Sequence, residues 1–409
     1  MKDRNRTTAK KSEVVSTGKS VVETAKDRYR MLYDRFDTVV VATSGGKDSC
    51  VALELAVEVA RERDRLPVHA MFFDEEVIYR ETDEYIRRIN GRDDVDLFWF
   101  ALPNRYRNAC SRKHPFFYPW HPDERDLWVR PLPDEAITEH PRWEWGDMTW
   151  DVVEKTFPPS KWGNVVHCSG VRAQESIMRY RVVANMRREA WVNKHPVGPW
   201  KNIRKACPIY DFETEDIWRA IHEHGWDYNR AYDKMNRLGF SFHQDQRIGP
   251  PFVEENIDLL RRFHDMEPEL WDRVCQRVHG VRTAYRYGDT KLYRPSAVDE
   301  RKPDNMTWRQ FVLMELDRWA PELRSNILQL LSAAIEKHRD MTDRPIPEEK
   351  PDWLTGASWR FFAICVAKGD VVGRQFSAMV DIAEKRRGEL GITFEEAMQR
   401  EREERYHCD

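Results

Sequence analysis

The sequence lacks paired cysteines, long apolar runs and a strong excess of either charge, and each absence excludes a class of protein. Seven cysteines are scattered through 409 residues without C-x-x-C spacing, which argues against a disulfide framework, a zinc site or a cysteine-ligated iron–sulfur cluster. No apolar run has the length of a membrane span, and the first residues lack the apolar core of a signal peptide. We therefore expect a cytoplasmic protein with reduced thiols and with neither zinc nor an iron–sulfur cluster.

The balance of charge gives no overall attraction to nucleic acid or to acidic membranes. The formal net charge is only -3, from 67 basic and 70 acidic residues. A chain of this length exceeds one ordinary hydrophobic core, so we expect two or three domains.

The stretch Thr38–Ser49, T-V-V-V-A-T-S-G-G-K-D-S, organises the rest of the chain. Its apolar first half predicts a buried strand, its glycines a tight turn, and the residues from Lys47 onward a helix. Glycines let the backbone approach a phosphate, and the free N–H groups and dipole of a helix start attract it. Lys47 adds a full positive charge, and the Ser44 and Ser49 hydroxyls can donate hydrogen bonds. The sequence therefore predicts a phosphate site.

Strands and helices alternate after this turn. A second strand is expected over Pro67–Phe73, ending at Asp74, followed by a helix over Arg80–Asn90 and a third strand over Leu97–Leu102. A helix over Val21–Phe36 would pack beside the first strand. This alternation predicts an α/β fold with a doubly wound, mostly parallel sheet. Ligands of such sheets bind beyond the carboxyl ends of the strands, where the glycine turn and Asp74 would lie.

The segment 104–159 interrupts this alternation and is dense in proline, tryptophan and charge. A loop of this length inside a compact domain is usually functional. It could form a lid that stacks a base or a substrate ring, or an ordered surface insertion held by its tryptophans. The sequence leaves both interpretations open.

A second candidate turn follows a strand expected over Asn164–Cys168. It contains Gly170 and Arg172 and leads into a helix expected over Gln174–Ala190, which carries Arg179. Arginine suits bidentate contact with phosphate and can neutralise charge on a leaving pyrophosphate. The alternative is a helix face held by salt bridges.

The rest of the chain reads as helical. Thr214 is expected to cap a helix, and Met306–His338 reads as a helical pair broken at Pro321. The expected domains are a disordered basic tail, a nucleotide-binding α/β domain that includes the insertion 104–159, and a helical C-terminal domain: 1–20, 21–298 and 299–409.

Six residues, Ser44-Gly45-Gly46-Lys47-Asp48-Ser49, resemble the PP-loop of the ATP pyrophosphatase superfamily. Enzymes of that superfamily cut ATP between the α and β phosphates, usually to adenylylate a substrate. The chain further resembles the branch of phosphoadenosine phosphosulfate (PAPS) reductases and ATP sulfurylase small subunits. That likeness rests on three more motifs: Phe73-Asp74 with Arg80-Glu81-Thr82, Gly170-Val171-Arg172 with Ser176, and Pro208-Ile209-Tyr210-Asp211 with Thr214–Trp218.

The resemblance implies an adenine nucleotide α-hydrolase-like fold, ATP or PAPS as the bound nucleotide, Mg²⁺ as a cofactor, and a set of site residues. Lys47, Arg172 and Asp48 would be catalytic, and Asp48 and Asp74 would hold or position magnesium. The nucleotide would be bound by Ser44, Gly45, Gly46, Lys47, Asp48, Ser49, Asp74, Gly170, Arg172 and Arg179.

A narrower resemblance is to the immunoglobulin-binding regulator (IbrA) group, PAPS-reductase-like proteins of bacteria and phages with an extra C-terminal helical region. The residues that carry it are Gly225–Asn229, Tyr232-Asp233 and Ser358–Lys368, with the Tyr210–Trp218 stretch. It extends the likeness over most of the chain.

The sequence differs from PAPS reductases at one motif, and this difference argues against sulfonucleotide reduction. Thioredoxin-dependent PAPS reductases carry a nucleophilic cysteine in a C-terminal E-C-G-L-H segment, which is absent here; Cys408 stands beside His407 instead. We expect an enzyme that adenylylates an unknown acceptor and releases pyrophosphate. The alternatives are PAPS reduction or sulfur transfer through Cys408, a phosphorothioation-like modification of DNA, and a regulator that binds nucleotide without catalysis. Nucleic acid, a partner protein encoded nearby and a homodimer stay open as partners beside the adenine nucleotide.

Overall fold

The structure is a computed structural model, and the residues that it describes are 18–139, 160–176, 179–180, 184–185, 188–189, 191–192, 202–241, 246–253, 256–287, 298–370 and 373–406. The chain divides into two compact units. The first comprises Met1–Tyr106, Tyr118–Pro251 and Arg261–Arg277, and the second Arg107–Phe117, Phe252–Leu260 and Val278–Asp409. The domain boundaries expected from the sequence stay a prediction, and the predicted tail falls largely outside the described residues.

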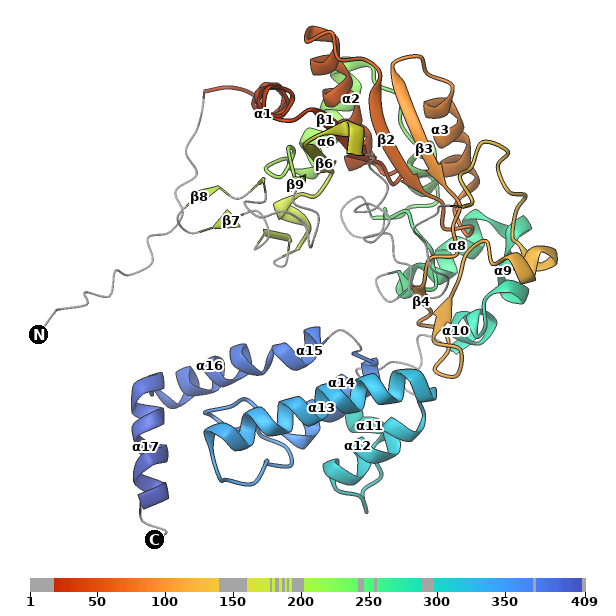
Figure 1. Cartoon of the computed structure of the whole chain (residues 1–409). Coiled ribbons are helices and arrows are strands. Elements are labelled where there is room, and N and C mark those ends of the chain that lie inside the picture. The colour runs from red at the N-terminus through yellow and green to blue at the C-terminus, as the bar shows by residue number, and fades with distance from the viewer. Residues whose placement is uncertain are drawn as a thin grey trace, which may run out of the picture. The chain divides into compact units, whose positions relative to one another are not determined.

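The first unit is built on a parallel sheet whose described strands follow the order β3-β2-β1-β6-β9 (Figure 1). Their bounds are Thr38–Ala42 for β1, Val68–Phe73 for β2, Val95–Phe100 for β3, Val165–Ser169 for β6 and Ile203–Ala206 for β9. The chain winds outward from β1 to β3 and then returns to the other side of β1. The expectation of a doubly wound α/β sheet is therefore confirmed, and its crevice lies where β1 and β6 end.

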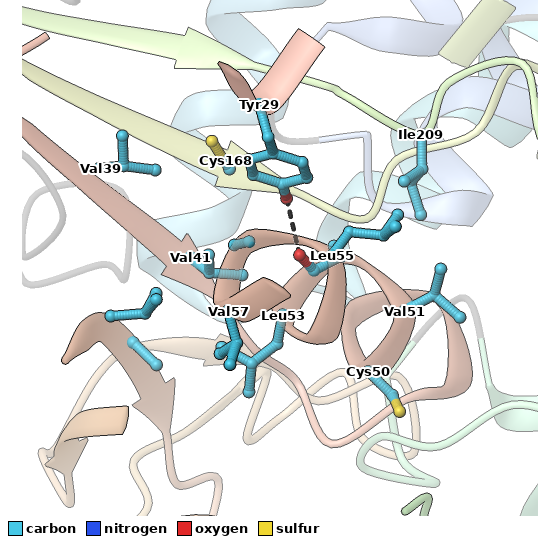
Figure 2. Close-up of a cluster of buried hydrophobic side chains, with 14 of the residues drawn as sticks. Tyr29, Val39, Val41, Cys50, Val51, Leu53, Leu55, Val57, Cys168 and Ile209 are labelled. Atoms are coloured by element: carbon cyan, nitrogen blue, oxygen red, sulfur yellow. Dashed lines mark hydrogen bonds between the residues drawn. The ribbon is translucent and has the colours of Figure 1, made fainter. Parts of the chain in front are cut away.

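Helices α1, α2, α3 and α6 share one hydrophobic core with alternate residues of the strands. They span Val21–Arg35, Lys47–Glu62, Arg80–Asn90 and Thr214–His224. Val39 and Val41 of β1 enter this core, whereas Val40 joins a smaller cluster on the opposite face, as the alternation of strand side chains requires. Helix α2 is apolar on nearly every side because it lies in the middle of the core (Figure 2). The Tyr29 hydroxyl of α1 donates to the Ala52 carbonyl of α2 at 2.8 Å.

The second unit is helical. Helices α11 to α17 span Val298–Arg301, Trp308–Asp317, Pro321–Met341, Trp359–Lys368, Arg374–Ser377, Met379–Leu390 and Phe394–Tyr406. Trp308, Phe311 and Phe362 lie in its hydrophobic core, and the buried Glu315 carboxylate pairs with Arg112 at 2.9 Å. The helical pair expected to break at Pro321 is confirmed, with Pro321 as the first residue of α13.

The remaining described elements are short. They are β4 (Tyr106–Arg107), β5 (Phe116–Phe117), β7 (Ala184–Asn185), β8 (Arg188–Glu189), η1 (Pro122–Leu127), η2 (Ser160–Trp162), η3 (Ala173–Glu175), η4 (Ile257–Leu259), α7 (Ala231–Arg237), α8 (Leu260–Met266), α9 (Pro268–Arg277) and α10 (Val281–Tyr287). Within the described part of the chain, we find no helix of the length and apolarity that a bilayer span requires.

The single helix expected over Gln174–Ala190 is wrong in part. Residues 179 and 180 are helical, but a short 3₁₀ turn, η3, begins the segment, and β7 and β8 pair as antiparallel strands near its end. The other residues of the segment lie partly outside the described part. The sequence Val182-Val183-Ala184-Asn185 favours strand and turn over helix, because β-branched residues suit strands and asparagine suits turns.

Two further local features differ from expectation. Ile203–Ala206 forms β9, a strand with partly exposed basic residues that pairs with β6 and was not predicted. Thr214 is not the cap of α6, because Glu213 takes that place in a capping box with Asp216. The third strand also lies two residues earlier than expected, at Val95–Phe100.

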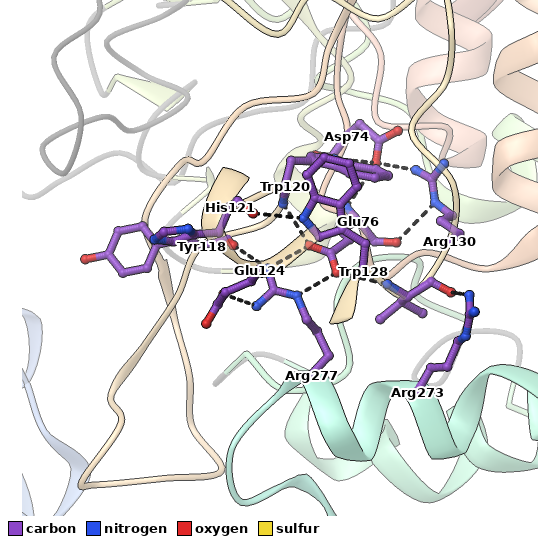
Figure 3. A network of polar contacts seen from close by, with 11 residues as sticks. Asp74, Glu76, Tyr118, Trp120, His121, Glu124, Trp128, Arg130, Arg273 and Arg277 are labelled. Carbon is purple, nitrogen blue, oxygen red and sulfur yellow. Dashed lines mark hydrogen bonds and ion pairs between the residues drawn. The ribbon is translucent and has the colours of Figure 1, made fainter. Parts of the chain in front are cut away.

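The described part of the aromatic insertion is held by a buried carboxylate (Figure 3). Glu76, fully buried, accepts hydrogen bonds from the backbone N–H groups of Trp120 at 2.7 Å and Val129 at 3.1 Å. The guanidinium of Arg277 on α9 donates to both of its oxygens, at 2.8 and 2.9 Å. Of the two interpretations of the insertion, an ordered segment held by its tryptophans fits residues 104–139, and the rest lies outside the described residues.

Replacing Glu76 with alanine should cost about 3–5 kcal/mol of stability, because the buried Arg277 guanidinium then keeps only the partly exposed Glu124 as a carboxylate partner, and the buried N–H groups of Trp120 and Val129 lose their acceptor. The measurement is urea unfolding followed by tryptophan fluorescence. Glu84→Ala, an exposed change on α3, is the matched control and should stay within about 0.5 kcal/mol of the wild type. Equal stability of the two variants would contradict the role given to Glu76.

Candidate active site

The glycine turn between β1 and α2 is shaped by close contacts. Gly45 has a φ of +76°, and a Cβ on it would lie 2.9 Å from Thr82 Cγ2 on α3. The positive φ and the short distance each require glycine at position 45. Gly46 precedes the first turn of α2 and has no side chain that could cap the N–H groups of that turn.

The two serines of the turn bond to the turn. Ser49 Oγ accepts from the Ser44 N–H at 3.2 Å and donates to the Gly46 carbonyl at 2.9 Å. The two hydroxyl oxygens lie 3.3 Å apart. These bonds fix the loop in one conformation, so the predicted phosphate-binding serines are brought together.

Gly170 and Arg172 come to the start of α2 from the end of β6. A Cβ on Gly170 would lie 2.8 Å from the carbonyl carbon of Asp48 and from the backbone nitrogen of Ser49, so only glycine permits this approach. Arg172 is buried, and its Nε lies 2.7 Å from Asp48 Oδ1. Its Nη1 donates to Gln174 Oε1 at 3.0 Å. The structure thus brings Asp48, Gly170 and Arg172 together.

Lys47 is buried at the first position of α2, with 7% of its surface exposed. Its Nζ lies 3.5 Å from Asp48 Oδ2 and 5.3 Å from the ring centre of Tyr232. Burial lowers the pKa of Lys47, the Asp48 carboxylate acts against that shift, and repulsion from Arg172 adds to it. An anion bound at the turn would relieve this cost by stabilising the charged ammonium.

Two residues that sequence reasoning missed hold the turn from the segment after α6. Asn229, fully buried, donates from Nδ2 to the Gly45 carbonyl at 3.0 Å and to Thr82 Oγ1 at 2.8 Å. The Tyr232 hydroxyl accepts from the Lys47 N–H at 3.1 Å. Both lie in the stretches on which the IbrA resemblance rests, which was the available signal, although the pattern did not reveal their contacts.

The remaining predicted residues lie in different surroundings. Arg179 is half exposed and forms an ion pair with Glu175. Asp74, buried at the end of β2, receives hydrogen bonds on its carboxylate from Trp99, from the Glu76 N–H and from Arg130 (Figure 3). Its oxygens therefore serve the fold around the insertion, and its role in magnesium binding stays a prediction. Cys408 lies outside the described residues.

Two family models match this chain. Residues 38–120 match the phosphoadenosine phosphosulfate reductase domain, and residues 239–344 match a domain of unknown function, DUF3440. Residues 38–120 are PAPS reductase-like. The IbrA resemblance stays a prediction. The PAPS reductase-like region contains the glycine turn, Lys47 and Asp74, whereas Gly170, Arg172, Asn229 and Tyr232 follow it in the chain.

Two relatives align over much of the chain. The uncharacterized protein YbdN of Escherichia coli K12 is 28% identical over 312 residues, covering 73% of this chain and 75% of that protein. The uncharacterized protein MJ0973 of Methanocaldococcus jannaschii is 21% identical over 282 residues, covering 64% of this chain and 56% of that protein.

Among solved structures, a PAPS reductase from Candida auris in a phosphate complex matches at a TM-score of 0.32 and 16% identity, covering 59% of this chain and 98% of that one. FMN adenylyltransferase of Candida glabrata matches at a TM-score of 0.32 and 11% identity, covering 54% and 62%.

Asn229→Ala should destabilise the first unit by about 1–3 kcal/mol, because the Gly45 carbonyl and the Ala231 N–H lose buried partners. Hydrogen exchange should quicken at the Gly46 and Lys47 amides, and urea unfolding gives the overall cost. Asn326→Ala, an exposed change on α13, should alter neither. Unchanged exchange at the turn would show that Asn229 does not hold it.

Glu75, the residue after Asp74, makes the stability of the fold depend on pH. Burial raises the pKa of Glu75 to about 8, although a hydrogen bond with Tyr106 acts the other way. The folded state holds this proton where the unfolded chain has released it, so stability falls as pH rises from about 4.5 to about 8.

Glu75→Gln should lessen this fall, since the amide has no proton to lose. Thermal unfolding at about pH 5 and about pH 8 should show a smaller loss for Glu75→Gln than for the wild type. Glu84→Gln is the exposed control, and it should reproduce the wild-type profile. A Glu75→Gln profile that parallels the wild type would contradict the shifted titration.

Proposed function

We propose that this protein binds ATP at the turn between β1 and α2 and transfers its adenylyl group to an acceptor, releasing pyrophosphate. PAPS, which shares the adenosine 5′-phosphate part, is the alternative nucleotide. The observation that carries the proposal is the convergence of Lys47 and Arg172 on the first turn of α2, beside a glycine turn whose shape is fixed by Gly45 and Gly170.

The residues would act on the phosphate chain. The N–H groups of the turn and of the first turn of α2 would bind phosphate oxygens. The Lys47 ammonium would stabilise the charge that builds on the leaving pyrophosphate, because it is already desolvated and needs no rearrangement. Arg172, held by Asp48 and Gln174, would face the same charge. An acceptor oxygen would then attack the α-phosphorus as the bond to the β-phosphate oxygen breaks.

The fit of magnesium to these residues is partial. Among the described residues, no group of three or more histidine, cysteine or acidic side chains has the geometry of a metal site. Magnesium is commonly held by one or two carboxylates together with substrate phosphates, and Asp48 at the start of α2 fits that pattern. Asp74 fits it less well, because its carboxylate is bonded to protein donors. Magnesium bound with the nucleotide would neutralise phosphate charge.

The test is Lys47→Ala. Wild-type protein with ATP and Mg²⁺ should bind the nucleotide in calorimetry and release pyrophosphate in a coupled assay, and Lys47→Ala should lower release by about 10²-fold or more. Lys337→Ala, an exposed lysine on α13, should leave both measurements unchanged. PAPS is titrated in parallel to decide between the nucleotides.

Two outcomes would contradict the proposal. One is a wild-type protein that binds neither ATP nor PAPS. The other is pyrophosphate release that survives Lys47→Ala at the wild-type rate, since the activity would then lie elsewhere in the preparation.

A further inference from the structure

The hydroxyl group of Tyr232 lies directly at the glycine turn. Tyr232 belongs to α7 and stands outside both regions that the family models match. Its hydroxyl oxygen accepts the Lys47 N–H at 3.1 Å and lies 3.4 Å from the position that a Cβ on Gly46 would take. The first N–H of α2, which has no partner within the helix, is therefore met by a side chain from another helix.

Packing holds the Tyr232 ring in this position. Only 2% of the residue is exposed. The ring of Trp218 on α6 packs edge-on against it, with the two ring centres 5.3 Å apart and the planes at 81°. The Lys47 ammonium lies 5.3 Å from the centre of the Tyr232 ring. A ring packed in this way keeps its hydroxyl oxygen at the turn, whereas the hydrogen on that oxygen can still rotate.

The same hydroxyl has a hydrogen left to donate. A tyrosine hydroxyl can accept one hydrogen bond and donate another. Within the described ranges of the chain, Tyr232 bonds through this group only to the Lys47 N–H, which uses it as an acceptor. Burial raises the pKa of Tyr232 and the Asp48 charge adds to the rise, while the bond from the Lys47 N–H acts against it. The group therefore keeps its hydrogen near neutral pH, and a ligand at the turn would give that buried donor an acceptor.

We propose that Tyr232 is a phosphate-binding residue of the nucleotide site, and that its hydroxyl donates to an oxygen of the leaving pyrophosphate group. This inference rests on the proposed function. The hydroxyl stands beside Lys47, whose ammonium is proposed to act on the same charge. Hydrogen bonds to a charged phosphate are stronger than those between neutral groups, and a donor that is already buried and fixed needs no rearrangement. The ligand class is a pyrophosphate group, free or as part of ATP.

Tyr228 offers a matched control for this role. Its ring also packs edge-on against Trp218, with the ring centres 5.4 Å apart, but its hydroxyl donates to Asp233 at 2.9 Å. Replacement of either tyrosine by phenylalanine removes one hydroxyl and keeps the ring. Only Tyr232→Phe removes a donor from the glycine turn.

The experiment compares the wild type with Tyr232→Phe and Tyr228→Phe. Calorimetry in the presence of Mg²⁺ measures binding of ATP, inorganic pyrophosphate and AMP to each protein. Tyr232→Phe should weaken ATP and pyrophosphate binding by about tenfold or more, because one hydrogen bond to a charged group is lost, and AMP binding by no more than about threefold. Tyr228→Phe should bind all three ligands as the wild type does. Thermal unfolding of each variant checks that the fold is kept.

The outcomes separate this inference from the proposed function. If Tyr232→Phe binds pyrophosphate as tightly as the wild type or more tightly, the hydroxyl only competes with phosphate for the Lys47 N–H; the inference is then wrong and the proposed function stands. If AMP binding falls as much as ATP and pyrophosphate binding, the residue acts on the fold or on the adenosine end, and the inference is wrong as well. If the wild type binds neither ATP nor pyrophosphate, adenylyl transfer from ATP and this role of Tyr232 fail together.

Discussion

The close approach of Gly170 to the first turn of α2 is the constraint on which the candidate site depends. Strands β1 and β6 pair in parallel, with Ala42 opposite Ser169, so both strands end at the same level. The next residue, Gly170, then meets the backbone of Asp48 and Ser49. Any side chain there would push the β6 turn and the helix apart. Because they stay together, Arg172 reaches Asp48 two residues later.

The polar groups of the glycine turn are satisfied within the protein more fully than its positive charge is neutralised. The hydroxyls and carbonyls of the turn are bonded within the protein, through Ser49 and Asn229, so the loop is rigid before a ligand arrives. The Lys47 ammonium is less fully compensated, because it is buried, lies 3.5 Å from the Asp48 carboxylate oxygen and is repelled by Arg172. A phosphate chain is bound best by hydrogen-bond donors that are already in place and by a positive charge that no nearby carboxylate fully neutralises.

The sequence predicted the parts of the fold that local patterns decide. The helix at Arg80–Asn90 was predicted to the residue, and the strand at Thr38–Ala42 from its apolar run, since amphipathic spacing and continuous apolar runs mark such elements strongly. Strand β9 was missed because an edge strand with a basic interior carries little apolar signal. The contacts of Asn229 could not be predicted, because it bonds to a turn 184 residues away and only the fold brings them together.

Among the predicted site residues, too, those marked by a local pattern were identified from the sequence. Glycines and lysine in a strand–turn–helix context identify the loop from local sequence, and the structure brings Lys47, Asp48, Gly170 and Arg172 to one place. Asp74 shows the limit of that approach. Its position at a strand end suggested a ligand, but the partners of its carboxylate come from the insertion and from β3.

The ion pair between Glu76 and Arg277 joins residues 201 positions apart, and it has a consequence for the order of folding. A nascent chain that has emerged only to residue 120 contains the whole PAPS reductase-like match but neither β6, β9 nor Arg277. It would hold Glu76 without its cation and β1 without one of its neighbouring strands. Such non-local closures slow folding, because the chain pays loop entropy before the contact forms. The first unit therefore completes this buried ion pair only after synthesis has passed α9.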